Sequence, residues 1–137
     1  MHTHTTHLRV RYAETDKMGY LYYGHYPKYY EVGRVELLRD LGWSYRQMED
    51  EAGIGMPVMS LDMRYVRPAY YDDLLTVITT LRRPPGETVT FHVEVKNERG
   101  KLVNGGRVKL CFIELATGKR VPPPQRLLDL LRSSFDD

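Results

Sequence analysis

A long amphipathic segment followed by strand-like segments limits how this chain can fold. Apolar side chains recur every three or four positions over residues 25–41, which predicts a helix that buries one stripe, and Gly42 follows its last turn. Alternation of apolar and polar residues then predicts strands at residues 56–66, 74–83, 89–96 and 101–115. Hairpin-like turns between them, such as residues 97–100, indicate an antiparallel sheet.

The predicted helix is too short to cover a flat sheet of these strands. Strands of roughly 10 to 14 residues extend about 33–45 Å, whereas a helix of about 17 residues spans only about 25 Å. We therefore expect the sheet to curl around the helix in an α+β fold. A short strand at residues 8–12, a helix at 44–52 with Ser44 as its N-cap, and a C-terminal helix at 125–135 complete the predicted elements.

The chain length of 137 residues predicts one domain, which we place at residues 8–137. Residues 1–7 carry His2, His4 and His7 among threonines. We interpret this segment as a disordered N-terminal tail and not as a metal site, because histidine spacing in a mobile terminus defines no coordination geometry.

Charge and cysteine content exclude several classes of protein. The net charge of +2 gives no strong field for nucleic acid or a membrane surface, and one cysteine excludes an intramolecular disulfide framework or a cysteine-based zinc cluster. No apolar run approaches the roughly 20 residues of a membrane span, and no secretory leader begins the chain. We therefore expect a cytoplasmic protein that binds no nucleic acid and no membrane and needs no metal or cofactor.

Tyrosine is unusually frequent, and it clusters around a polar loop. The chain has 11 Tyr against 3 Phe and 1 Trp, and seven of the tyrosines lie between Tyr12 and Tyr30. The loop at residues 13–24 contains Asp16 directly before the predicted helix, whose first N–H groups can stabilise an oxyanion. Asp16 is therefore a candidate general base or nucleophile. The alternative is that Asp16 only caps a turn.

Two blocks of this sequence resemble a known enzyme family. The first runs from Tyr12 through Asp16 and Gly19 to Tyr26, and continues as Tyr-Tyr-Glu at residues 29–31 with Arg34. The second comprises residues 55–60, 63–69 and 71–74. Together they resemble the 4-hydroxybenzoyl-CoA thioesterase family, and within it the YbgC-like acyl-CoA thioesterases of the hotdog fold. The similarity covers residues 8–115.

The resemblance implies a long curved antiparallel sheet wrapped around a central helix, with two sheets paired edge to edge in a homodimer that often assembles into a homotetramer. It implies hydrolysis of an acyl-CoA thioester to a carboxylic acid and free coenzyme A. Asp16 takes the position of the catalytic aspartate, and the backbone N–H of Tyr23, with Gly24, takes the position that polarises the thioester carbonyl. The implied substrate-binding residues are His25, Tyr26, Pro57 and Arg67.

Residues 22–26 depart from the pattern of many relatives. Tyr23 stands where these relatives have a histidine, and His25 stands where they have an asparagine. Two other functions remain open: a hotdog hydratase or dehydratase acting on acyl thioesters, which would pair a histidine with an acidic residue, and a non-catalytic acyl-CoA-binding protein. We also expect several of the clustered tyrosines to border one cleft at a subunit interface.

Overall fold

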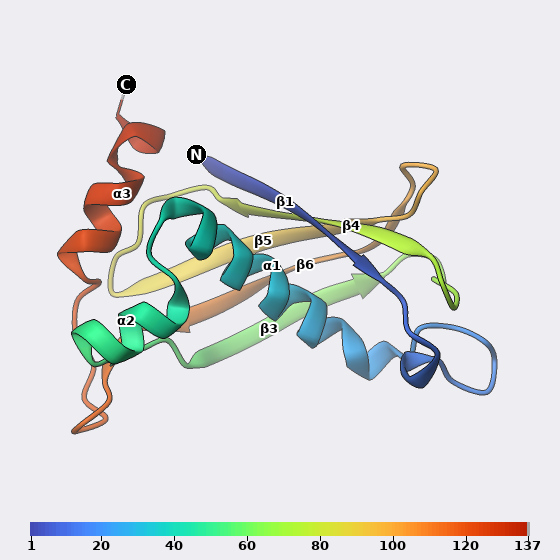
Figure 1. Ribbon diagram of the computed structural model, residues 1–137, viewed down its shortest axis with the longest axis horizontal. Helices are drawn as coiled ribbons and strands as arrows, with labels where there is room; N and C mark the ends of the chain where they lie inside the picture. The colour runs from blue at the N-terminus through green and yellow to red at the C-terminus, as the bar shows by residue number, and fades with distance from the viewer. Residues whose placement is uncertain (137) are drawn as a thin grey trace.

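The computed structural model describes residues 1–136; residue 137, the last of the predicted domain, lies outside the described residues. A five-stranded antiparallel sheet in the order β1-β4-β5-β6-β3 forms the frame of the described chain (Figure 1). Its strands are β1 (His2–Arg9), β3 (Val58–Tyr65), β4 (Leu74–Leu81), β5 (Thr88–Lys96) and β6 (Leu102–Cys111). The short strands β2 (Ile54–Gly55) and β7 (Ile113–Glu114) pair with each other in a separate two-stranded ribbon.

The long helix α1 (Tyr26–Leu41) lies across one face of the sheet (Figure 1). Its start next to His25 and its end at Gly42 confirm the predicted helix, and Gly42 adopts a left-handed conformation with φ 97° that ends the last turn. The predicted apolar stripe is buried at Tyr26, Tyr30, Gly33 and Leu37, whereas Leu41 is only partly covered. The buried stripe holds the helix against the sheet.

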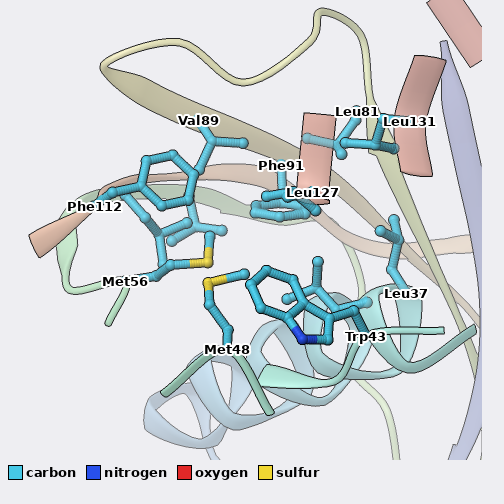
Figure 2. Close-up of a cluster of buried hydrophobic side chains, with 13 residues drawn as sticks. Leu37, Trp43, Met48, Met56, Leu81, Val89, Phe91, Phe112, Leu127 and Leu131 are labelled. Carbon is cyan, nitrogen blue, oxygen red and sulfur yellow. The ribbon is translucent and has the colours of Figure 1, made fainter. Parts of the chain in front are cut away.

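Two shorter helices close one end of the core. The predicted helices at 44–52 and 125–135 are confirmed as α2 (Tyr45–Ala52) and α3 (Gln125–Phe135), and the Ser44 side chain caps α2 by accepting a hydrogen bond from the Gln47 N–H. Figure 2 shows side chains from all three helices and the strands meeting in one cluster. Its buried members include Leu37, Trp43, Met48, Phe91, Phe112, Leu127 and Leu131.

The prediction of a disordered tail at residues 1–7 is wrong. Strand β1 begins at His2 and pairs with β4 along its whole length, from His2 opposite Leu81 to Arg9 opposite Leu74. His2, His4, Thr6 and Leu8 are partly buried while the residues between them are exposed, which is the alternation of a strand with one covered face. The partner strand β4 lies about 70 residues away in the sequence, so no local sequence pattern predicts this pairing.

Two other strand predictions need adjustment. The strand predicted at 8–12 ends at Arg9, because residues 12–14 form a short 3₁₀ turn. The strand predicted at 101–115 divides at Phe112 into β6 and β7, which pair with different partners. The sheet strands are 8 to 10 residues long, shorter than expected.

Candidate active site

A tight turn fixes the position of Asp16. Its Oδ1 atom accepts hydrogen bonds from the N–H groups of Met18 (3.0 Å) and Tyr20 (3.1 Å), and its backbone carbonyl accepts one from Gly19 (2.9 Å). Gly19 has φ 84°, a left-handed conformation that glycine adopts at little cost. Asp16 therefore does cap a turn. Within residues 1–136, both side-chain hydrogen bonds end on Oδ1, which leaves Oδ2 available to a ligand.

Glu14 attaches this loop to helix α1. Its Oε1 atom accepts hydrogen bonds from the Arg11 N–H (3.0 Å) and from the Tyr29 hydroxyl (2.9 Å), and its Oε2 atom lies 3.5 Å from Lys28 Nζ. Partial burial disfavours the charged carboxylate, but the two hydrogen bonds and the Lys28 charge outweigh burial and lower the pKa of Glu14. No sequence pattern predicts this role of Glu14.

The chain enters α1 through a 3₁₀ turn at Tyr23–His25, directly after this loop. The Tyr22 N–H donates to the Glu14 carbonyl, and the His25 N–H donates to the Tyr22 carbonyl. The N–H groups of Tyr23 and Gly24 stand at the start of the turn, where helical geometry supplies no acceptor. They carry partial positive charge, so this position favours an oxyanion.

A cleft of about 300 Å³ opens beside Asp16. It brings together four of the predicted site residues, Asp16, Tyr23, Tyr26 and Arg67. Its other lining residues are Met18, Tyr20, Leu21, Tyr65, Val66 and Pro68. A larger hollow of about 430 Å³, around His92 and Arg107, contains none of the predicted residues.

Three predicted site residues do not line this cleft. Gly24 lies under the ring of Tyr22, so that a Cβ atom there would stand 2.7 Å from Tyr22 Cε2. The His25 ring packs edge-on against Tyr22, with ring centroids 5.6 Å apart. Pro57 is exposed just before β3, and its carbonyl accepts a hydrogen bond from Cys111.

Tyrosine rings form the aromatic wall of the cleft. Tyr65, at the end of β3, contacts Tyr23 and Tyr26 edge-on at centroid distances of 6.1 and 5.5 Å, and its hydroxyl donates to the Tyr23 carbonyl (3.2 Å). Burial, with a smaller contribution from Tyr65, raises the pKa of Tyr26 to about 12, so its phenol stays neutral at physiological pH. The expectation that several clustered tyrosines border one cleft is confirmed for Tyr20, Tyr23 and Tyr26. The location of this cleft at a subunit interface stays a prediction.

Sequence reasoning missed the contribution of residues 65–68 apart from Arg67. Tyr65 and Val66 end the strand predicted at 56–66, and Arg67 and Pro68 follow it, so the sequence marks the end of an element but not its neighbour in space. Within residues 1–136, no group of three or more His, Cys, Asp or Glu side chains is placed to hold a metal ion. No helix in the described chain is long and apolar enough to span a membrane.

The fold is that of a hotdog protein. A DHNA-CoA thioesterase structure from Staphylococcus aureus superposes with a TM-score of 0.84 at 29% identity, over 98% of this chain and 96% of that one. The family model of the thioesterase-like superfamily matches residues 10–131, and the chain belongs to this superfamily. The fold and family implied by the sequence blocks are therefore confirmed.

Two curated relatives agree with this assignment. The chain is 35% identical over 102 residues to the putative acyl-CoA thioesterase YneP of Bacillus subtilis, which covers 74% of this chain and 73% of that protein. It is 28% identical over 120 residues to the acyl-CoA thioesterase YbgC of Haemophilus influenzae, which covers 88% of each.

Proposed function

We propose that this protein is an acyl-CoA thioesterase that hydrolyses an acyl-CoA thioester to a carboxylic acid and free coenzyme A. The observation that carries the proposal is the Oδ2 atom of Asp16, which accepts no hydrogen bond within residues 1–136, in an aromatic cleft that also contains Tyr23 at the start of the 3₁₀ turn before α1. The names of the relatives support the same reaction class.

In the proposed reaction, the thioester carbonyl oxygen accepts hydrogen bonds from the N–H groups at Tyr23–Gly24, which stabilise the negative charge that develops on it. Asp16 attacks the carbonyl carbon directly, or removes a proton from a water molecule that attacks it. The carbon–sulfur bond then breaks. When water attacks, the coenzyme A thiolate takes up the proton that Asp16 removed from the water, and the carboxylic acid is released. When Asp16 attacks directly, the thiolate takes up a proton from water, and the acyl group remains on Asp16 as a mixed anhydride, which a second water molecule hydrolyses to the carboxylic acid and free Asp16. A positioned base contributes about 10²- to 10⁴-fold in rate, and an oxyanion donor about 10²- to 10³-fold.

Substrate binding is assigned to the residues that surround Asp16. Tyr26 supplies a ring and a neutral hydroxyl in the cleft wall, and Arg67 supplies an exposed guanidinium at its rim, suited to a phosphate of coenzyme A. His25 and Pro57 remain proposed substrate-binding residues, although they lie outside the cleft of their own chain.

We propose that the active form is a homodimer, further paired into a homotetramer. Strand β3 is hydrogen-bonded to β6 on one side only, at an edge of the sheet (Figure 1). Its side chains Val58, Met59, Leu61 and Tyr65 are 50%, 46%, 40% and 53% exposed. An apolar strand edge of this kind favours pairing with another strand. The proposed compartment is the cytoplasm, where acyl-CoA thioesters are metabolised.

The variant Asp16→Asn tests the proposed function. Asparagine retains an oxygen for the Met18 and Tyr20 N–H groups, so the loop keeps its shape while the base is lost. We expect the release of free thiol from a panel of aliphatic and aryl acyl-CoA substrates to fall at least 10²-fold. Circular dichroism and the melting temperature should remain those of the wild type.

Asp72→Asn is the matched control, because Asp72 is an exposed loop carboxylate outside the cleft. It should retain full activity. If Asp16→Asn keeps more than about a tenth of the wild-type rate, the assignment of Asp16 as nucleophile or general base is wrong. With crotonyl-CoA, loss of enoyl absorbance without thiol release would instead indicate a hydratase. Binding of acyl-CoA with no reaction at all would indicate a binding protein.

A further inference from the structure

The exposed edge of β3 carries a charge pattern that is complementary to itself. Leu61 and Met63 pair with Val108 and Gly106 on the face that packs toward α1, so Asp62 and Arg64 point to the opposite face. Asp62 is exposed, and its Oδ2 atom lies 3.8 Å from Nε of Arg107 in the same chain. In an antiparallel pair of two β3 strands, each Asp62 comes to lie opposite Arg64 of the second copy. An in-register parallel pair would place like charges side by side.

This charge pairing selects one register, and the register has a consequence for the cleft. With Asp62 opposite Arg64 of the second copy, Leu61 lies opposite Tyr65, and Met59 lies opposite Arg67. Tyr65 and Arg67 line the cleft that contains Asp16. The start of β3 in one copy therefore meets the cleft of the other copy. A shift of the second strand by two residues would keep each side chain on the same face of the sheet. It would place Met59 opposite Tyr65, which also lines the cleft.

Met59 occupies an irregular and exposed position near the start of β3. The register of β3 against β6 shifts between Val58 and Ser60, so Met59 is the extra residue of an irregularity in the strand and has no partner in β6. Such a bulge redirects a side chain. Met59 is 46% exposed in the isolated chain, although it is apolar. A flexible thioether fits against aromatic rings such as those of Tyr23 and Tyr65.

We propose that Met59 acts on the second copy of the chain: it forms a wall of that copy's Asp16 cleft and determines which acyl groups fit. The proposal rests on the acyl-CoA thioesterase function and adds a specificity residue supplied across the β3 edge. Pro57, which does not line the cleft of its own chain, approaches the same cleft of the second copy.

Complementation between two inactive variants tests this arrangement. Asp16→Asn removes the base, and Met59→Trp fills the cleft while keeping the strand edge apolar. Each homodimer should lose at least tenfold in kcat/KM and remain a dimer by sedimentation. In a heterodimer isolated with two different tags, one site has both Asp16 and Met59 intact, and the other site has neither. We expect about half of the wild-type activity.

The results that would overturn the proposal are specific. If Met59 lined the cleft of its own chain, the heterodimer would have no intact site and would show no gain. Full activity of the Met59→Trp homodimer, or a monomeric wild-type protein, would also overturn it. Should the tryptophan variant fail to fold, Met59→Ala serves instead: the smaller side chain should shift the kcat/KM preference about tenfold toward longer acyl chains, and an unchanged profile would contradict the proposal.

A cross-linking arm does not depend on catalysis. Met59→Cys combined with Arg67→Cys, or with Tyr65→Cys, should form covalent dimers on mild oxidation, visible on a non-reducing gel. Met59→Cys combined with Asp72→Cys is the control and should not. A wild-type protein that releases no thiol refutes the proposed function, whereas a failure to cross-link in a dimeric protein refutes the placement of Met59.

Discussion

Glu14 connects the Asp16 loop to helix α1 through a single carboxylate. The pKa of this group is lowered in the folded protein, because hydrogen bonds from Arg11 and Tyr29 and the charge of Lys28 overcome the effect of burial. A carboxylate whose pKa is lowered stabilises the fold above its unfolded pKa, and this stabilisation is lost as the pH falls through the folded pKa. Acidification below pH 4.5, the ordinary pKa of a glutamate, should therefore weaken the attachment of this loop to α1.

The variant Glu14→Gln measures that contribution. At pH 7 we expect it to lower the free energy of unfolding by about 1.5–3 kcal/mol, the range for a hydrogen bond to a charged group. Urea unfolding of both proteins from pH 7 to pH 3 should show the difference shrinking as Glu14 is protonated. Glu87→Gln, at an exposed position, is the control and should follow the wild type. A difference that is constant with pH would contradict the role of the charge.

At the scale of the elements, the close approach of α1 to β4 depends on Gly33. A Cβ atom at this position would overlap Thr79 Oγ1 and would stand 3.0 Å from Val77 Cγ1. Thr79 is fully buried, and its hydroxyl has no hydrogen-bond partner within residues 1–136. The glycine therefore allows the helix to lie close against this part of the sheet, at the expense of helix propensity.

Gly33→Ala should destabilise the protein by about 1–3 kcal/mol through overpacking, although alanine is favoured over glycine in a helix by about 1 kcal/mol. Chemical unfolding provides the measurement. The double variant Gly33→Ala/Thr79→Ala should lose less free energy of unfolding than the two single variants lose together, because the hydroxyl that overlaps the new Cβ atom is removed. Gly86→Ala, where a Cβ atom has no neighbour within 4 Å, is the control. Strictly additive effects would contradict the steric explanation.

At the scale of the whole molecule, β3 is one of the two edge strands of the sheet, and its edge is the more apolar one. In the proposed dimer, Asp62→Arg would place an arginine opposite Arg64 of the second copy. The two-fold axis repeats this contact, so two pairs of like charges would face each other. We expect the dimer dissociation constant to rise at least about fivefold, since opposed like charges on paired strands are destabilising. Sedimentation equilibrium at low salt measures this change, which should diminish as salt screens the charges.

The reversed pair Asp62→Arg/Arg64→Asp restores the complementarity and should restore the dimer. Glu94→Arg changes a charge on β5, away from either edge of the sheet, and should leave the dimer unaffected. Equal weakening by the single and the reversed double variant would argue against the antiparallel register.

Local patterns in the sequence were sufficient for the elements whose hydrogen bonds close within a few residues. The span of α1 follows from its apolar period and Gly42, and the start of α2 follows from the Ser44 cap. Asp16 was recognised in the loop before α1 for the same reason, because its contacts with Met18 and Tyr20 lie within four residues. Two sequence blocks also identified the family.

Only the tertiary structure decided which distant residues meet. The segment expected to be a disordered tail forms β1, because β4 supplies its hydrogen-bond partners. Tyr65 lies beside Tyr23 and lines the same cleft as Asp16. Pro57 lies outside the cleft of its own chain. Strand pairing and cleft walls depend on contacts between residues that are far apart in sequence, and a period of two specifies an alternating strand but not its neighbour. The sequence by itself therefore determined the helices and the Asp16 loop, because their contacts are local, and the packing of the sheet decided what surrounds them.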